Sequence, residues 1–247
     1  MSDTTTQGHS GHASPTTRRP AAEERSLQQA GLVAGVGILV LAALSAFGIY
    51  YVVEGLVTQG DAAGTVEDIR SSDGLFRWGV VSLYIVVVLD VVVAWALFRF
   101  FSPVSSGLSR LAAWFRLAYA AIFLLAIGQL AGIPDLVTND EYSDVFTAEQ
   151  IQGQTLVKTD AFADLWMAGL ILFGIHLLLV GYLAYRSSYV PKLIGVLLLV
   201  AGAGYVFDSV VSTVLASPPG SVATVTFLGE FLLAIWLVVR GRTATAS

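Results

Sequence analysis

Residues 174–186 read GIHLLLVGYLAYR, a stretch that is apolar enough to lie in lipid and yet contains a histidine, His176. It belongs to an apolar segment at about residues 163–185, close to the length of about 20 residues with which a helix crosses a bilayer. Arg186 ends the stretch, as expected where a membrane helix meets water. The stretch therefore predicts a transmembrane helix with a titratable side chain about two residues from its centre.

The composition of the whole chain also favours a membrane protein. Of the 247 residues, 55% are hydrophobic and 13% are charged, whereas roughly a quarter are charged in soluble domains. A soluble core could not hide so much apolar surface, because too few polar residues remain to coat it. The chain has no cysteine, which excludes disulfides, thiolate metal sites and thiol catalysis.

Six apolar segments define the predicted fold, which is all-α: an integral membrane bundle of six transmembrane helices over residues 28–242. The spans are expected at about 31–53, 78–101, 111–134, 163–185, 193–216 and 222–239. Residues 1–27 combine Ser, Thr, Gly, Pro and charge without apolar periodicity, so we expect a disordered tail there. Residues 243–247 form a second, short tail.

The positions of lysine and arginine predict the orientation, because cytosolic loops carry an excess of both. With the N-terminus in the cytosol, nine of these residues lie inside: Arg18, Arg19, Arg25, Arg99, Arg110, Arg186, Lys192, Arg240 and Arg242. Three lie outside: Arg70, Arg77 and Lys158. We therefore predict N-in/C-in, with both tails cytosolic. The richness in Arg, Ala, Val and Gly is typical of prokaryotic chains, which places the protein in a prokaryotic plasma (cytoplasmic) membrane.

Two outer connections are long enough to carry structure of their own. Residues 65–70 within the first connection predict a short helical turn. In the second, Thr147 and Gln150 have the spacing of a capping box, in which each side chain bonds the other residue's backbone N–H. We expect a helix to start there and to continue into the fourth span.

Strongly polar side chains fall inside the predicted spans at five positions: Asp90, Arg116, His176, Asp208 and Glu230. Each would cost at least about 2.5–3.5 kcal/mol if it faced lipid, so we expect all five to face the interior and to meet in a ligand- or proton-binding cluster. Asp90, His176 and Glu230 should share a layer near the midplane, given a rise of about 1.5 Å per residue. Charged residues near the outer ends of the spans are candidates for a rim: Arg77, Glu54 and Asp164.

The charges of this cluster do not balance. Three carboxylates against one arginine leave two negative charges if all are ionised and His176 is neutral, which a dry interior does not tolerate. Either a carboxyl is protonated, or His176 is an imidazolium, or the site is hydrated, or a cation binds.

Three functions follow as alternatives. The first is a binding or transport-like protein whose cluster holds a small ligand, a cation or protons. The second is an intramembrane enzyme that acts on a lipidic substrate. The third is a structural or regulatory partner in which polar side chains join helices by hydrogen bonds. No HExxH, Walker or GxSxG motif and no basic nucleic-acid patch occurs, so we predict no metal, cofactor or nucleic acid. The lipid bilayer is the expected partner, and the oligomeric state stays open.

A series of short strings resembles a known family. In chain order they are FRWG (76–79), LDV (89–91), SPV (102–104), FRL (115–117), GIHLLLVGYLAYRSSYVPK (174–192), GYVFD (204–208), GE (229–230) and WL (236–237). They resemble the prokaryotic multi-pass membrane family catalogued as domain of unknown function 4386, over about residues 28–240. Ser188 stands where that family has Gly. The resemblance implies a six-helix membrane protein and no particular activity. It also implies that the polar residues are family positions: Arg77, Asp90, Arg116, His176, Asp208 and Glu230.

Overall fold

The computed structural model describes residues 18–215 and 228–241, and every regular element in these ranges is helical. The helices are α1 (Arg18–Ser45), the π-helix η2 (Ala46–Val53), α2 (Glu54–Leu56), α3 (Ala62–Ser71), α4 (Asp73–Phe101), α5 (Ser106–Ala131), α6 (Ile133–Thr138), α7 (Asp140–Val145), α8 (Ala148–Arg186), α9 (Lys192–Val214) and α11 (Leu228–Arg240). The predicted all-α class is confirmed.

Within the described residues, five helices are long and apolar enough to cross a membrane. They correspond to the first five predicted spans. The sixth, at 222–239, lies partly outside the described residues. Its described part, α11, has 13 residues, which is about 20 Å at the usual rise and short of a hydrocarbon core of about 30 Å. The structure thus shows five of the six predicted spans.

The first helix begins earlier than the sequence analysis expected. Residues 18–27, assigned above to a disordered tail, belong to α1. The segment 21–30 reads AAEERSLQQA, and most of these residues have high helix propensity. Pro20 falls in the first turn, where a proline costs no helix hydrogen bond. The boundary was therefore wrong because Ala, Glu and Gln continue a helix beyond its apolar part. The rest of the predicted tails, 1–17 and 242–247, lies outside the described residues.

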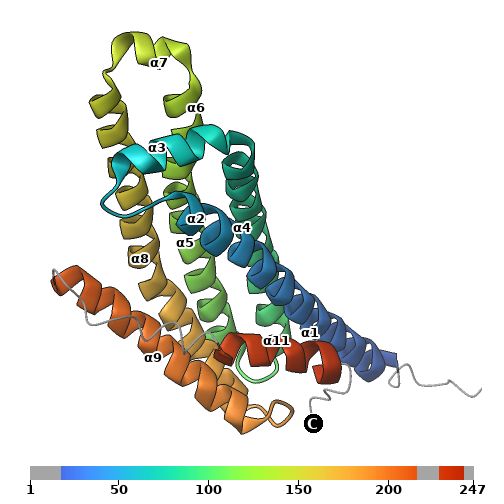
Figure 1. Ribbon diagram of the computed structural model, residues 1–247. Helices are drawn as coiled ribbons and strands as arrows, with labels where there is room; N and C mark the ends of the chain where they lie inside the picture. The colour runs from blue at the N-terminus through green and yellow to red at the C-terminus, as the bar shows by residue number, and fades with distance from the viewer. Residues whose placement is uncertain (1–17, 216–227, 242–247) are drawn as a thin grey trace, which may run out of the picture.

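The long helices form a closed ring around a shared core. Each long helix contacts the next long helix along the chain, in the order α1, α4, α5, α8 and α9. The ring is closed by α11, which packs against both α9 and α1. Figure 1 shows α4, α5 and α8 running lengthwise, with α11 lying across one end of them. We call this arrangement the helix ring; it puts one face of four different helices toward a common centre.

Glycine pairs bring α8 and α9 into backbone contact. A Cβ added to Gly202 would lie 2.6 Å from the carbonyl oxygen of Gly174, and one added to Gly181 would lie 2.9 Å from that of Gly195. In each helix the two glycines are seven residues apart, so they line one face. Small residues at such contacts are what allows membrane helices to approach closely.

Three short helices, α3, α6 and α7, form a cap at the end of the ring away from the α4–α5 and α8–α9 turns (Figure 1). There α3 lies across the bundle, near α6 and α7 (Figure 1). The predicted turn at 65–70 is part of α3. The predicted capping box is confirmed, because Thr147 N–H donates to Gln150 and Gln150 N–H donates to Thr147 Oγ1. As expected, the helix that starts there continues through the fourth span. It has 39 residues, about 58 Å long, and so reaches well beyond a bilayer core.

Candidate functional site

The site is built around Arg116, which projects from α5 and is fully buried at 0% exposure. Its Nε donates to Asp90 Oδ1 on α4 at 2.8 Å, and its Nη1 donates to Glu230 Oε1 on α11 at 2.7 Å. The same Nη1 lies 3.2 Å from His176 Nε2 on α8. Asp90 and His176 are each 1% exposed and Glu230 is 9% exposed. We call these four side chains the Arg116 cluster; it joins four helices of the ring through one guanidinium.

The hydrogen bonds of His176 define its tautomer. His176 Nδ1 lies 2.9 Å from the carbonyl oxygen of Ala112, which can only accept, so Nδ1 carries the proton and donates. Nε2 is then the acceptor for Arg116 Nη1. His176 is thereby a neutral imidazole with both ring nitrogens engaged, and in this arrangement neither is free to exchange protons with Glu230.

One edge of the guanidinium has no protein partner. Arg116 Nη2 is buried, and no hydrogen-bond acceptor among the described residues reaches it. Its two N–H groups are thus left over after Asp90, Glu230 and His176 have taken the other three. A buried donor left without a partner costs about 1–3 kcal/mol, which calls for an acceptor beyond those that the described residues supply.

Aromatic rings form the apolar wall of the site. Arg116 Cζ lies 5.3 Å from the centroid of the Phe173 ring, within the distance at which a cation is attracted to a ring face. Tyr119 and Tyr205 pack against Phe173, with ring centroids 4.9 and 5.5 Å away. Sequence reasoning missed these residues. Phe173 is three residues from His176 and Tyr119 three from Arg116, a helical spacing that places each pair on one face.

The fifth predicted member of the cluster is Asp208. Asp208 is partly buried on α9 and is not bonded to Arg116. The hydrogen bonds described above for Arg116 thus join four of the five expected residues. The glycine pairs place Gly202 level with Gly174, and Ser209 lies beside Met167, so Asp208 is about eight residues, or roughly 12 Å, along the bundle from His176.

The predicted rim residues are likewise scattered. Arg77 bonds Asp73, four residues before it, and Asp135 on α6 at 2.8 Å. Glu54 and Asp164 are exposed on α2 and α8. Arg77 thus ties α4 to the cap rather than to the Arg116 cluster.

The described residues contain no group of three or more His, Asp or Glu side chains arranged to hold a metal ion. In the Arg116 cluster both carboxylates and His176 are bonded to the guanidinium. A positive charge thus already occupies the position among them that a cation ligated by all three would need.

Comparisons with known proteins agree with this architecture. Residues 33–241 match the family described as "Domain of unknown function (DUF4386)". The chain is similar to an uncharacterised protein of Archaeoglobus fulgidus, with 35% identity over 165 residues, which are 67% of this chain and 85% of the relative. No solved structure matches the chain. Since the family match spans most of the sequence and includes every residue of the Arg116 cluster, the chain belongs to the DUF4386 family of membrane proteins.

Proposed function

We propose that this protein is a membrane-embedded binding protein, of a transport-like kind, whose site is the Arg116 cluster. The single observation that carries the proposal is the unpartnered Nη2 of a fully buried arginine. Buried polar groups are almost always hydrogen-bonded in native proteins. An acceptor oxygen of a small ligand, or a water molecule that precedes it, would satisfy Nη2.

The charge of the cluster supports a co-bound positive charge. One guanidinium faces two carboxylates, and His176 is neutral, so the group carries one excess negative charge when both carboxyls are ionised. A buried excess charge is costly. One proton or one monovalent cation would balance it, and this makes binding at the cluster dependent on protons or on Na⁺.

The depth of the cluster fits such a role. Asp90, Arg116 and His176 lie ten or eleven residues from the ends of α4, α5 and α8 at the two Pro-containing turns. That corresponds to about 15 Å, half of a bilayer core of about 30 Å. Transporters place their substrate and ion sites near the midplane, between helices.

The orientation is part of the proposal. The excess of Lys and Arg at the ends near the α4–α5 and α8–α9 turns supports N-in/C-in in a prokaryotic plasma membrane, with the six spans that the sequence predicts. The cap then lies outside.

A second role, as a structural organiser, is favoured by a different observation. Arg116 is bonded to side chains from three other helices at 2.7–3.2 Å, which is how polar residues join membrane helices. In that case water would occupy the position beside Nη2, and neither protons nor Na⁺ would have a specific effect.

The two roles are separated by thermal unfolding of the protein in lipid nanodiscs as pH and Na⁺ concentration are varied. Anything that binds the folded state alone raises its stability by mass action. For a binding site we expect protons or Na⁺ to raise Tm in the wild type, and Glu230→Gln to abolish that response while the protein remains folded. The control is Asp164→Asn, which removes an exposed carboxylate. Equal responses in the wild type and Glu230→Gln would refute the binding role.

A second measurement addresses Nη2 directly. Arg116→Lys keeps one positive charge and three N–H donors, enough for Asp90, Glu230 and His176 but with none left for a ligand. Native mass spectrometry of protein taken directly from its own membrane should show a bound small molecule in the wild type and in the control Arg110→Lys. The molecule should be missing from Arg116→Lys. Equal retention by Arg116→Lys would exclude Nη2 as its donor.

A further inference from the structure

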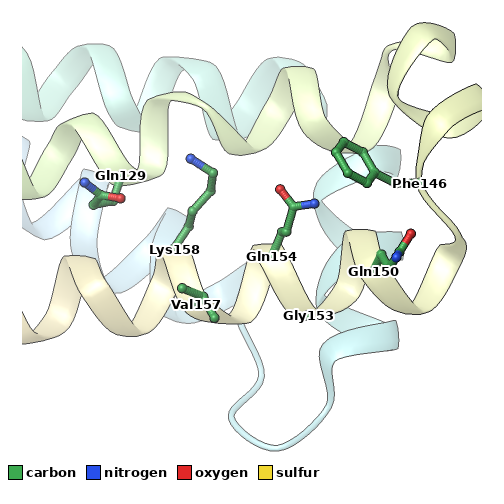
Figure 2. Close-up of a pocket in the computed structure, with 7 residues that line it drawn as sticks. All are labelled: Gln129, Phe146, Gln150, Gly153, Gln154, Val157 and Lys158. Carbon is green, nitrogen blue, oxygen red and sulfur yellow. The ribbon is translucent and has the colours of Figure 1, made fainter.

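A groove lies far from the Arg116 cluster, at the end of the bundle that carries the cap. It is an open groove of about 520 Å³ between the end of α5, the residue that follows α7, and α8 (Figure 2). Its lining is Gln129, Phe146, Gln150, Gly153, Gln154, Val157 and Lys158. Four of these seven residues have polar side chains and none is acidic, although acidic residues are common on the surrounding cap.

Lys158 brings an unneutralised positive charge to this groove. Arg70 and Arg77, the other basic residues at this end, are already engaged: Arg70 bonds Val137 O and lies near Glu67, and Arg77 bonds two aspartates. Lys158 makes no ion pair and no side-chain hydrogen bond within the part of the chain that the structure describes. A Cβ on Gly132 would lie 3.3 Å from Lys158 Nζ, so the ammonium lies against the bare backbone at the start of α6.

Two amide side chains add donors on the same side. Figure 2 shows Gln154 and Lys158 extending from α8 toward the helix that carries Gln129. Neither Gln129 nor Gln154 has a side-chain hydrogen bond to any other described residue, whereas the carbonyl of Gln150 is used by the capping box. An ammonium and two amide groups are therefore unsatisfied around one space. Together they match an anion with several acceptor oxygens.

The height of the groove narrows the class of anion. Lys158 precedes the predicted span at 163–185 by one turn and a half, or roughly 8 Å. That distance corresponds to the headgroup layer, where lysine and aromatic side chains are commonly found. Phe146 and Val157 line the groove next to the polar groups and offer apolar contacts to whatever carries the anion.

We propose that this groove binds a phosphate group, with Lys158 as the cation and Gln129 and Gln154 as hydrogen-bond donors. The phosphate belongs either to the headgroup of an anionic lipid of the outer leaflet or to a soluble phosphate compound. This site is independent of the Arg116 cluster, so its failure would leave the proposed function untouched.

The chain offers an internal control, because Lys158 and Lys192 are its only lysines. Lys192 lies at the other end, with Nζ 5.6 Å from the Tyr185 ring centroid. The full chain is placed in nanodiscs of phosphatidylcholine, with or without phosphatidylglycerol or added inorganic phosphate. Both lysines are then modified with an amine-reactive reagent, and their rates are followed by peptide mass spectrometry. A bound phosphate slows the modification of Lys158 relative to Lys192, by about fivefold when the site is mostly occupied.

The outcomes are distinct. Protection by phosphatidylglycerol alone identifies a lipid headgroup, and protection by inorganic phosphate in phosphatidylcholine identifies a soluble ligand. In either case, replacing both Gln129 and Gln154 by Ala should remove the protection although Lys158 is still present. Equal slowing of both lysines would reflect only the surface potential of the membrane. That result, the absence of any protection, or protection that survives the double replacement would overturn the proposal.

Discussion

At the scale of single residues, Arg116 determines the chemistry of the interior. Its guanidinium is bonded to side chains from three other helices and retains one buried edge without a partner in residues 18–215 and 228–241. Breaking a buried ion pair by removing one partner is far more costly than removing an exposed charge, because the other partner stays buried and unpaired.

We therefore expect Arg116→Leu to lower the free energy of unfolding by about 3–5 kcal/mol. The exposed residue Arg110 on the same helix is the matched control. Arg110→Leu should change the free energy of unfolding by less than about 0.5 kcal/mol. Equilibrium unfolding in mixed micelles measures both values.

The same physics predicts non-additivity. Replacing Arg116, Asp90 and Glu230 together by Leu removes the charges as a group and should be less destabilising than Arg116→Leu alone. A triple variant that is less stable than the single variant would contradict the account of a buried, mutually paired cluster.

A further prediction concerns the protonation of His176. Since Nδ1 donates to Ala112 O and Nε2 accepts from Arg116, we expect the less common Nδ1–H tautomer in a neutral ring. ¹⁵N NMR of histidine-labelled protein, with His9 and His12 replaced by Gln so that a single signal remains, distinguishes the tautomers. An Nε2–H tautomer or an imidazolium would show that the hydrogen bonds differ from those described here.

At the scale of elements, two close helix contacts position the cluster. The Gly174–Gly202 and Gly181–Gly195 pairs bring α8 and α9 together beside His176. On the other side, the π-helix η2 meets α4 where Ser82 Oγ donates to Gly79 O at 2.6 Å and reaches Leu44 O at 3.4 Å. A side chain inserted into a helix ladder is a known cause of such irregular turns.

Gly202→Ala should destabilise the protein by about 1–3 kcal/mol, because the new Cβ would overlap the backbone of α8. The added Cβ at position 202 would lie 2.6 Å from Gly174 O and 2.8 Å from Leu178 N. The control is Gly128→Ala on α5, where no atom lies within 4 Å; it should be neutral or stabilising by up to about 1 kcal/mol. Thermal unfolding in nanodiscs compares the two variants, and equal effects would show that α8 and α9 are not in backbone contact.

Much of the element pattern could be predicted from the sequence, for reasons that particular residues make clear. Apolar length identified the five long helices, and Thr147 with Gln150 identified the start of α8, because both signals are local. The π-helix could not be predicted, since η2 packs against α4, and a contact with a distant helix leaves no local signal in the sequence. The grouping of Asp90, Arg116, His176 and Glu230 was expected from the cost of polar groups in lipid. Asp208 is not among the side chains that bond Arg116, because the cost of polar groups in lipid predicts burial but not the level at which α9 packs against α8.

At the scale of the whole molecule, the helix ring has two unlike ends. One end carries the cap of α3, α6 and α7, with most of the acidic residues; the other carries the Pro-containing turns and α11 (Figure 1). The charge bias that predicts N-in/C-in assigns the cap to the outside.

The absence of native cysteines makes this orientation directly testable. Ser143 in α7 and Ser188 in the α8–α9 turn are both exposed. In intact cells a membrane-impermeant maleimide should label Ser143→Cys, whereas Ser188→Cys should react only after the membrane is permeabilised. The reversed pattern would mean the opposite orientation. Labelling of both cysteines in intact cells would contradict a membrane crossing by α8, the helix that separates them in the chain.

The closure of the ring by α11 has a consequence for biogenesis. A ribosome delivers α4, α5 and α8 to the membrane first, and Arg116 with Asp90 then forms a pair without net charge. Glu230 arrives last and brings the surplus carboxylate. We therefore expect the docking of α11 to be the step of assembly at which the nascent protein takes up a compensating proton or cation.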